Sequence, residues 1–359
     1  MAHQSLYRAY RPQSFGEVAG QEQVTRPLAE AVAAGEVGHA YLFAGSRGLG
    51  KTTVARILAR EVGCTEQDLY EVDAASNNSV EDVRALTEGV YTLPFESPYK
   101  VYILDEVHML SKSAWNAFLK TLEEPPAHTI FILATTELNR VPETVQSRCQ
   151  VFEFKKPTRK GLAEVVTKVA EKEGYRIDGD AAELIAMLAE GSYRDALSIL
   201  QKSVLQPLEV SGLKEAGGTV AKENIINLHR ENVEFLTGAP RREQVHALVA
   251  ALAAGERGAA LAAVESAASA SVDMTLFLEL VLAALRSVLL IRYAPELRNS
   301  LQEELGADEY ATLETYVGST RPYITHQTLL AFLTASERIR YAPIPALPLE
   351  LAVLELFPE

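Results

Sequence analysis

The most informative stretch of the sequence is residues 45–52, whose residue types and spacing suit the binding of a nucleoside triphosphate. It reads Gly-Ser-Arg-Gly-Leu-Gly-Lys-Thr, the phosphate-loop pattern G-x-x-x-x-G-K-[ST]. Its glycines let the backbone curve so that successive N–H groups point at phosphate oxygens. Lys51 adds a positive charge for the outer phosphates, and the Thr52 hydroxyl is suited to hold Mg²⁺. In and beside this loop, the residues expected to contact nucleotide are Gly45, Gly48, Leu49, Gly50, Lys51, Thr52 and Thr53.

The flanks of this loop have the patterns that a phosphate loop requires. Residues 40–44 form a short apolar run, Ala-Tyr-Leu-Phe-Ala, which predicts a strand buried on both faces. Apolar residues at helical spacing follow the loop and predict a helix that packs one face on the sheet: Val54, Ile57, Leu58 and Val62. This strand, loop and helix argue against a chance match in a glycine-rich turn.

A second candidate site element is the acidic pair Asp105 and Glu106, which ends the apolar run 101–104. Open α/β sheets bind their ligands at the carboxyl ends of the strands. There Asp105 is placed to reach the Mg²⁺ shell, and Glu106 to orient or deprotonate an attacking water. An apolar strand that ends in two acids is weak evidence alone, but together with the phosphate loop it indicates metal-assisted phosphoryl transfer.

Another buried strand is expected at 129–134, and it ends in the hydroxyl pair Thr135 and Thr136. Two interpretations of this pair stand: the hydroxyls bond the γ-phosphate or the attacking water, or they are a polar strand end. Strands alternate with helical patterns from residue 40 onward. This alternation predicts a doubly wound, mostly parallel sheet.

Two other segments have two interpretations each. The aromatic and aliphatic segment 6–24 either lines a base pocket or closes the core as an N-terminal arm. Leu93 and Phe95 flank a proline in an expected loop, and they are either ordinary packing or an exposed tip for a partner.

Composition describes a globular protein of two or three domains, because 359 residues exceed the usual size of one core. The net charge of −14 does not indicate general nucleic-acid binding, so any DNA contact would come from local basic groups. Cys64 and Cys149 are the two cysteines, too few for a disulfide framework or a four-cysteine zinc site. We see no uninterrupted apolar run of membrane-spanning length and no signal peptide, so the expected location is the cytoplasm.

The remainder of the chain is expected to be helical. Strands are not expected after Thr158, and the periodicity predicts a small helical domain followed by a loop at 207–222. From Pro240 onward, apolar residues recur at helical spacing up to the chain's end. The last group of apolar residues at helical spacing packs either in the chain's own core or at an interface between subunits. This last apolar group consists of Leu349, Ala352, Val353 and Leu356.

Taken together, the motifs closely resemble those of the gamma/tau subunits of the bacterial DNA polymerase III clamp loader. The motifs that carry the resemblance span residues 6–200. Besides the phosphate loop they are Arg11-Pro12 with Phe15, Val18 and Gly20-Gln21-Glu22, Asp73-Ala74-Ala75-Ser76, Asp105-Glu106-Val107-His108-Met109-Leu110, Leu119-Lys120-Thr121-Leu122-Glu123-Glu124-Pro125-Pro126, Ala134-Thr135-Thr136, Ser147-Arg148-Cys149 and Gly191-Ser192 with Arg194-Asp195-Ala196-Leu197.

The resemblance implies an α/β P-loop NTPase of the AAA+ type with a helical lid and an all-α collar. The corresponding domains are an ATP-binding domain at 1–157, a lid at 158–238 and a collar or oligomerisation domain at 239–359. It also implies site residues outside the phosphate loop. These are Tyr10, Arg11, Pro12 and Val18 at the nucleotide, Thr136 among the catalytic residues, Arg194 as a sensor, and Arg148, which reaches a neighbouring subunit's site.

The function implied by the resemblance is that of an ATP-driven motor that opens the sliding clamp and loads it onto primed DNA. Its partners would be delta, delta-prime and further gamma/tau copies, the clamp, and DNA through its phosphates. The alternatives are a delta-prime-like architectural subunit with little hydrolysis, and an AAA+ regulator that acts on protein. A stator has no use for Lys51, Thr52, Asp105 and Glu106, which argue against the first alternative.

The sequence departs from the family pattern at two places. Family members usually carry a four-cysteine zinc module after the phosphate-loop helix, whereas here only Cys64 occupies that region, so no zinc is expected. The chain ends at Glu359, and we expect it to correspond to the short, clamp-loading form or to a shortened chain.

Overall fold

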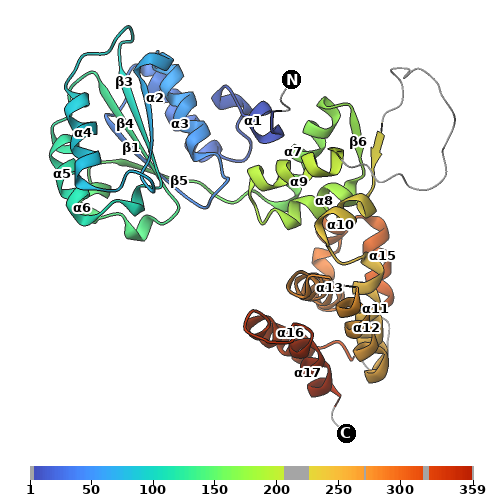
Figure 1. Cartoon of the computed structure of the whole chain (residues 1–359). Helices are drawn as coiled ribbons and strands as arrows, with labels where there is room; N and C mark the ends of the chain where they lie inside the picture. The colour runs from blue at the N-terminus through green and yellow to red at the C-terminus, as the bar shows by residue number, and fades with distance from the viewer. Residues whose placement is uncertain (1–3, 206–225, 271, 318–322, 358–359) are drawn as a thin grey trace. The chain divides into compact units, whose positions relative to one another are not determined.

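The computed structural model describes residues 4–205, 226–270, 272–317 and 323–357 (Figure 1). The loop expected at 207–222 lies outside these residues. The chain divides into two compact units. The first comprises Met1–Tyr175 with Ala182–Gln201, and the second Arg176–Ala181 with Lys202–Glu359.

A five-stranded sheet forms the centre of the first unit, with the order β2-β3-β4-β1-β5 and parallel pairing throughout. Its strands are β1 (Ala40–Ala44), β2 (Leu69–Asp73), β3 (Lys100–Asp105), β4 (Thr129–Thr135) and β5 (Gln150–Glu153). The parallel sheet is confirmed, and so are the strands expected at 40–44, 101–104 and 129–134. The edge strand β5 was not anticipated, because its four residues, Gln-Val-Phe-Glu, carry too short an apolar pattern to stand out.

Helices cover both faces of this sheet, with α2 and α3 on one side and α4 and α5 on the other (Figure 1). Alternate side chains of one strand enter the two cores: Leu42 packs with α4 and α5, whereas Tyr41 and Phe43 pack with α2 and α3. Burial on both faces explains the continuous apolar runs in the sequence. The helices are α2 (Glu22–Ala34), α3 (Lys51–Glu61), α4 (Val80–Val90), α5 (Lys112–Glu123) and α6 (Glu143–Gln146).

Helices dominate after Thr158, but the expectation that strands end there is wrong. A two-stranded sheet pairs β6 (Tyr175–Ile177) with β7 (Ile226–Leu228), and beside it the Asp178 N–H donates to the Leu228 carbonyl at 3.1 Å. Strands of three residues are too short to show a period of two, so the pattern did not reveal them. The helices of this region are α7 (Arg159–Lys172), α8 (Gly179–Leu188) and α9 (Tyr193–Leu205).

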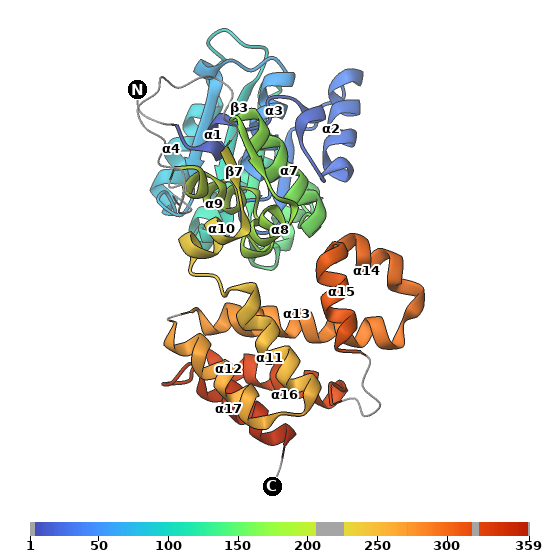
Figure 2. The same cartoon turned by 90° about the vertical axis from the view of Figure 1, so that its right-hand side faces the viewer.

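The described part of the second unit beyond β7 is helical, as expected (Figure 2). Its helices are α10 (Arg230–Thr237), α11 (Arg242–Ala254), α12 (Arg257–Ser269), α13 (Met274–Tyr293), α14 (Arg298–Leu305), α15 (Ala307–Thr315), α16 (His326–Ile339) and α17 (Leu347–Leu356). Helix α13 is long and apolar enough to cross a membrane. Its side chains Phe277, Val281 and Val288 are nevertheless buried in the unit's core, which accounts for its composition. Three residues of the last apolar group also lie in this core: Leu349, Ala352 and Val353.

Short elements connect these helices and strands. One short helix opens the described chain, α1 (Leu6–Ala9). Single 3-10 turns complete the connections: η1 (Phe15–Glu17), η2 (Glu66–Asp68), η3 (Val107–Met109), η4 (Leu138–Arg140) and η5 (Pro295–Leu297).

The loop after α4 presents the two apolar side chains singled out in the sequence. Leu93 and Phe95 are 79% and 78% exposed, so they are not ordinary packing, and their contact with a partner stays a prediction. A buried carboxylate holds this loop: Asp68 accepts backbone N–H bonds from Phe95, Glu96 and Ser97 at 2.6, 3.0 and 2.9 Å. Burial alone would raise the pKa of Asp68, but these donors outweigh it and lower the pKa to about 2.

Replacing Asp68 with Asn tests this anchor. Since the folded pKa of about 2 lies below the ordinary 3.8, the carboxylate stabilises the fold above pH 3.8 and loses this effect as the pH falls toward 2. We expect Asp68→Asn to lower the free energy of unfolding by about 1–3 kcal/mol at pH 7. Urea unfolding at pH 7 and at pH 3 measures the effect, which should shrink at the lower pH. The exposed neighbour Glu66, changed to Gln, serves as the control; an equal loss in both variants contradicts the assignment.

Candidate active site

The phosphate loop connects β1 to α3, and its glycines adopt backbone angles that other residues rarely take. Gly48 and Gly50 have φ values of +79° and +98°. The Lys51 ammonium lies over the loop and donates to the carbonyls of Gly45 and Ser46 at 2.5 and 2.9 Å. Burial lowers the pKa of Lys51, while the carboxylates of Glu106 and Asp105 oppose this shift. A cation buried this deeply attracts an anion strongly.

The Mg²⁺ ligands expected from the sequence lie next to each other. The Thr52 hydroxyl, in the first turn of α3, donates to Oδ2 of Asp105 at 2.8 Å. Asp105 ends β3, so the two groups come from different elements and meet beyond the carboxyl end of β4. Hydroxyl and carboxylate oxygens are the ligands that Mg²⁺ prefers. The donor set therefore fits this metal, and Thr52 and Asp105 would hold it.

The candidate base, Glu106, has a strained backbone with φ 50° and ψ 44°. Its Oε2 accepts hydrogen bonds from the hydroxyl of Thr136 at 3.0 Å and from the Thr136 N–H at 3.3 Å. The hydroxyl pair at the end of β4 thus separates into two roles. Thr136 contacts the acidic pair, whereas Thr135 is fully buried and its hydroxyl accepts the Glu137 N–H.

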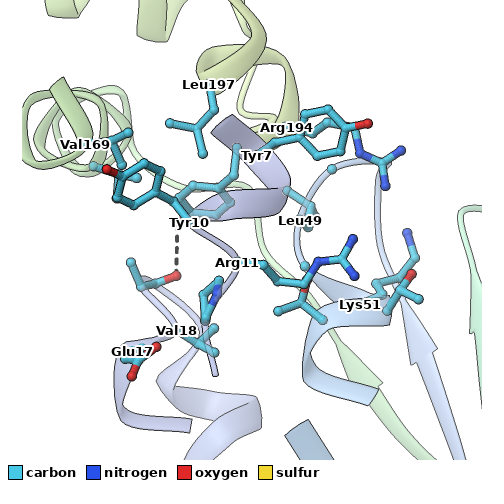
Figure 3. A pocket seen from close by; sticks show the side chains of 18 of the residues that line it. Tyr7, Tyr10, Arg11, Glu17, Val18, Leu49, Lys51, Val169, Arg194 and Leu197 are labelled. Carbon is cyan, nitrogen blue, oxygen red and sulfur yellow. Dashed lines mark hydrogen bonds between the residues drawn. The ribbon is translucent and has the colours of Figure 1, made fainter. Parts of the chain in front are cut away.

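A cavity of about 370 Å³ lies beside these groups (Figure 3). Its lining includes most residues expected at the nucleotide: Tyr10, Arg11, Pro12, Val18, Gly48, Leu49, Gly50, Lys51, Thr52 and Thr53, with Asp105, Glu106 and Arg194. The N-terminal segment lines the cavity through Tyr10 and Arg11, and it also closes the core, in which Val24 is buried with Phe15 packed against it. Gly45 is not in the lining, and its carbonyl accepts a hydrogen bond from Lys51 instead.

The cavity has one cationic side and one apolar side. Figure 3 shows the guanidinium groups of Arg11 and Arg194 on the side of Lys51, with Val169 and Leu197 away from it. Such a division suits a ligand with a polyanionic end and a flat apolar end. A nucleoside triphosphate has both.

Several lining residues were missed by the sequence reasoning. Among them are Val165 and Val169 from α7, Leu197 from α9 and Tyr7 from α1. The apolar spacing of α7 was recognised, but it was assigned to helix packing alone. Helix α1 reaches the cavity because the Leu6 N–H donates to the Gln201 side chain in α9 at 3.1 Å. A pattern within a short stretch of sequence cannot reveal this contact, because its two residues lie far apart along the chain.

Tyr7 and Tyr10 show how α1 supports the cavity. The Arg194 guanidinium lies 5.6 Å from the centre of the Tyr7 ring, a cation–π distance. The Tyr10 hydroxyl donates to Glu173 at 2.6 Å, and this bond raises the pKa of Tyr10 to about 12. Both tyrosines are thereby fixed relative to the lid helices.

Among the charged residues that the sequence analysis assigned to the site, Arg148 does not line the cavity, whereas the others do. It follows α6, where its guanidinium pairs with Glu123 at 2.5 Å and donates to the Thr144 carbonyl at 2.6 Å. Its side chain is 34% exposed. Arg148 is therefore away from this chain's own phosphate loop and open to solvent.

Protein-family models of DNA polymerase III match nearly the whole chain. The model "DNA polymerase III, delta subunit" matches residues 20–79 and 67–158. The model "DNA polymerase III clamp loader subunit, ATPase lid domain" matches residues 162–206. The model "DNA polymerase III subunits gamma and tau domain III" matches residues 228–358.

Individual relatives agree with these models. DNA polymerase III subunit tau of Bacillus subtilis is 44% identical over 225 residues, which cover 57% of this chain and 40% of the relative. The tau subunit of Escherichia coli is 33% identical over 377 residues, which cover 99% of this chain and 55% of the relative. The chain thus spans 40% and 55% of the lengths of these two relatives.

Among solved structures, the Thermotoga maritima RuvB Holliday junction branch migration motor is similar in fold. Its TM-score is 0.52 at 24% identity, covering 68% of this chain and 79% of RuvB. This likeness supports the AAA+ fold alone.

Contact between the phosphate loop and α9 can be tested at Gly48. A Cβ on Gly48 would lie 2.0 Å from the Ser192 hydroxyl oxygen, whereas a Cβ on Gly50 meets nothing within 4 Å. Both positions have positive φ, so Ala strains either backbone by about 1–3 kcal/mol. We expect Gly48→Ala to weaken ATP binding at least about tenfold more than Gly50→Ala, because only the first displaces the lid helix. Fluorescent-nucleotide titration measures this, and equal affinities of the two variants would refute the contact's importance.

Proposed function

This chain belongs to the gamma/tau family of DNA polymerase III subunits, and we propose that it is an ATP-hydrolysing motor subunit of the clamp loader. In this role it opens the sliding clamp and places it on primed DNA. The observation that carries the proposal is the bond between Thr52 and Asp105 with Lys51 and Glu106 around it. A subunit that only scaffolds has no need for these four groups in one place.

The chain's own residues perform distinct tasks in hydrolysis. Lys51 and the N–H groups of the loop bind the outer phosphates, while Arg11 and Arg194 add positive charge on the same side of the cavity. Mg²⁺, when bound by Thr52 and Asp105, neutralises charge on the phosphates. Glu106 orients the attacking water and accepts its proton, since its carboxylate lies at the strand ends next to Asp105.

Arg148 is proposed to act on a neighbouring subunit's nucleotide. Support comes from its partial exposure and from its position away from its own cavity. A guanidinium supplied in trans neutralises charge that develops at the γ-phosphate and couples hydrolysis to assembly. Its pair with Glu123 is partly solvated, so it holds the side chain weakly and leaves it free to re-pair.

The wider proposal includes the partners and the organisation of the chain. The chain would assemble with delta, delta-prime and further gamma/tau copies in the cytoplasm. Residues 1–157, 158–238 and 239–359 would be the ATP-binding, lid and collar domains. Leu93 and Phe95 would face the clamp, and DNA phosphates would be met near the start of α4, after Asn77 and Asn78. No zinc is part of this proposal.

The motor role is tested by removing the base. We expect Glu106→Gln to bind ATP as the unmodified chain does and to hydrolyse it about 10²–10⁴-fold more slowly, since the amide cannot accept the proton. The measurement is single-turnover hydrolysis with the other loader subunits, clamp and primed DNA, each omitted in turn. Equal rates for both chains would indicate a stator instead. A hydrolysis rate that does not change when clamp or primed DNA is omitted would indicate a regulator of other proteins.

Complementation tests the action of Arg148 in trans. Arg148→Ala should bind ATP but lose about 10³–10⁵-fold in hydrolysis, as expected for a missing arginine finger. Lys51→Ala should fail to bind. In a mixed assembly, a Lys51→Ala subunit can still supply its arginine to the site of an Arg148→Ala neighbour. We therefore expect mixing to restore hydrolysis that neither variant shows alone, whereas an arginine acting within its own subunit predicts no restoration.

A further inference from the structure

His108 is a buried imidazole beside the acidic pair that the roles assigned so far do not use. It lies in η3, two residues after Glu106, and its side chain is 7% exposed. It is not among the residues that line the cavity. Polar side chains face both of its ring nitrogens, as buried polar groups require, and their identity shows which groups the ring can position.

The Nδ1 side of the ring faces the catalytic base. Nδ1 lies 3.1 Å from the Thr135 hydroxyl oxygen and 3.4 Å from Oε2 of Glu106. This Oε2 is the same oxygen that accepts the two bonds from Thr136. The ring and Thr136 therefore approach one carboxylate oxygen from two elements, η3 and the end of β4.

The Nε2 side of the ring faces a second carboxylate. Nε2 lies 3.4 Å from Oε1 of Glu137, whose other oxygen pairs with Arg140 at 2.9 Å. Glu137 is itself placed by its N–H bond to Thr135. The two nitrogens thus have different neighbours: Nδ1 has the Thr135 hydroxyl and the base, and Nε2 has a surface ion pair.

The strained backbone of Glu106 sends its side chain in an unusual direction, so the contacts of the carboxylate decide its orientation. At φ 50° the side chain leaves the strand in a direction that a regular β residue does not take. Oε2 is engaged by Thr136, and among hydrogen bonds between described residues none reaches Oε1. Keeping Oε2 against Thr136 leaves Oε1 to take a proton from water.

We propose that His108 is a positioning residue for Glu106: through Nδ1 it holds the carboxylate in the orientation that presents Oε1 to the attacking water. This inference rests on the proposed function, because it assigns Glu106 as the base. It predicts an effect on the hydrolytic step and none on nucleotide affinity, since misplacing a catalytic group slows chemistry without removing a binding contact.

Two amide variants separate the nitrogens. The Asn side chain places its amide near the position of Nδ1, and the longer Gln side chain places its amide near that of Nε2. His108→Asn therefore keeps a polar group toward Thr135 and Glu106, whereas His108→Gln keeps one toward Glu137. Both remove the same ring and leave one amide in the same site, so each controls for the other's loss of packing.

We expect His108→Gln to lower the single-turnover rate on the order of tenfold to a hundredfold, and His108→Asn to retain most of the rate. Both should bind fluorescent ATP within about twofold of the unmodified chain. The measurements are made on the full chain with the other loader subunits, clamp and primed DNA, and thermal unfolding checks that the two variants are equally stable.

Each outcome of these measurements either supports or overturns the role proposed for His108. Rates that are equal in the Asn and Gln variants, or lower in the Asn variant, overturn the role of Nδ1, and so does a loss of ATP affinity parallel to the loss of rate. Glu106→Gln in the same assay separates this failure from failure of the proposed function. If Glu106→Gln is inactive while both His108 variants match the unmodified chain, only the inference about His108 is wrong. If Glu106→Gln is fully active, the motor assignment itself fails.

Discussion

The site depends on one short hydrogen bond, that between Thr52 and Asp105. It joins the helix after the phosphate loop to the end of a strand two places away in the sheet. It can form only because β3, β4 and β1 pair in parallel and end nearly level, as the partners Ala44 with Thr135 and Leu104 with Leu133 show. A slip of one residue would turn every strand side chain to the opposite face and remove the acid from the loop. The two apolar cores that fix this register thus also fix the position of the metal ligands.

Around this bond, the groups proposed for binding and those proposed for hydrolysis lie in different parts of the site. Cations gather at one side of the cavity, where burial lowers the pKa of Lys51. The carboxylates lie at the strand ends, where Thr136 bonds the candidate base. Helices α7 and α9 supply apolar contacts and Arg194, so they add an apolar wall and one more cation to the same cavity. A single cavity therefore combines recognition of the whole nucleotide with placement of its reacting end.

Local sequence was sufficient wherever local physics decides the structure. The phosphate loop, the buried strands and the start of α4 each follow from glycine conformation, burial on two faces or helix capping. Ser79 illustrates the last case, since its hydroxyl accepts the Asp82 N–H and its own N–H donates to the Asp82 carboxylate. Short strands such as β5, β6 and β7 were not foreseen, because their pairing partners come from distant parts of the chain.

The sequence by itself predicted a triphosphate site, the residues expected to bind its phosphates and metal, and a neighbouring strand that ends in two acids. These predictions were possible because a phosphate loop and its acidic partner strand are recognised by the types and spacing of residues along the chain. Only the tertiary structure decided that Tyr7, Val169 and Leu197 enclose the same cavity, that Thr136 rather than Thr135 contacts Glu106, and that Arg148 does not line this cavity. Such contacts join residues far apart in sequence, and which of them form depends on how helices and strands pack, a property that no local pattern encodes.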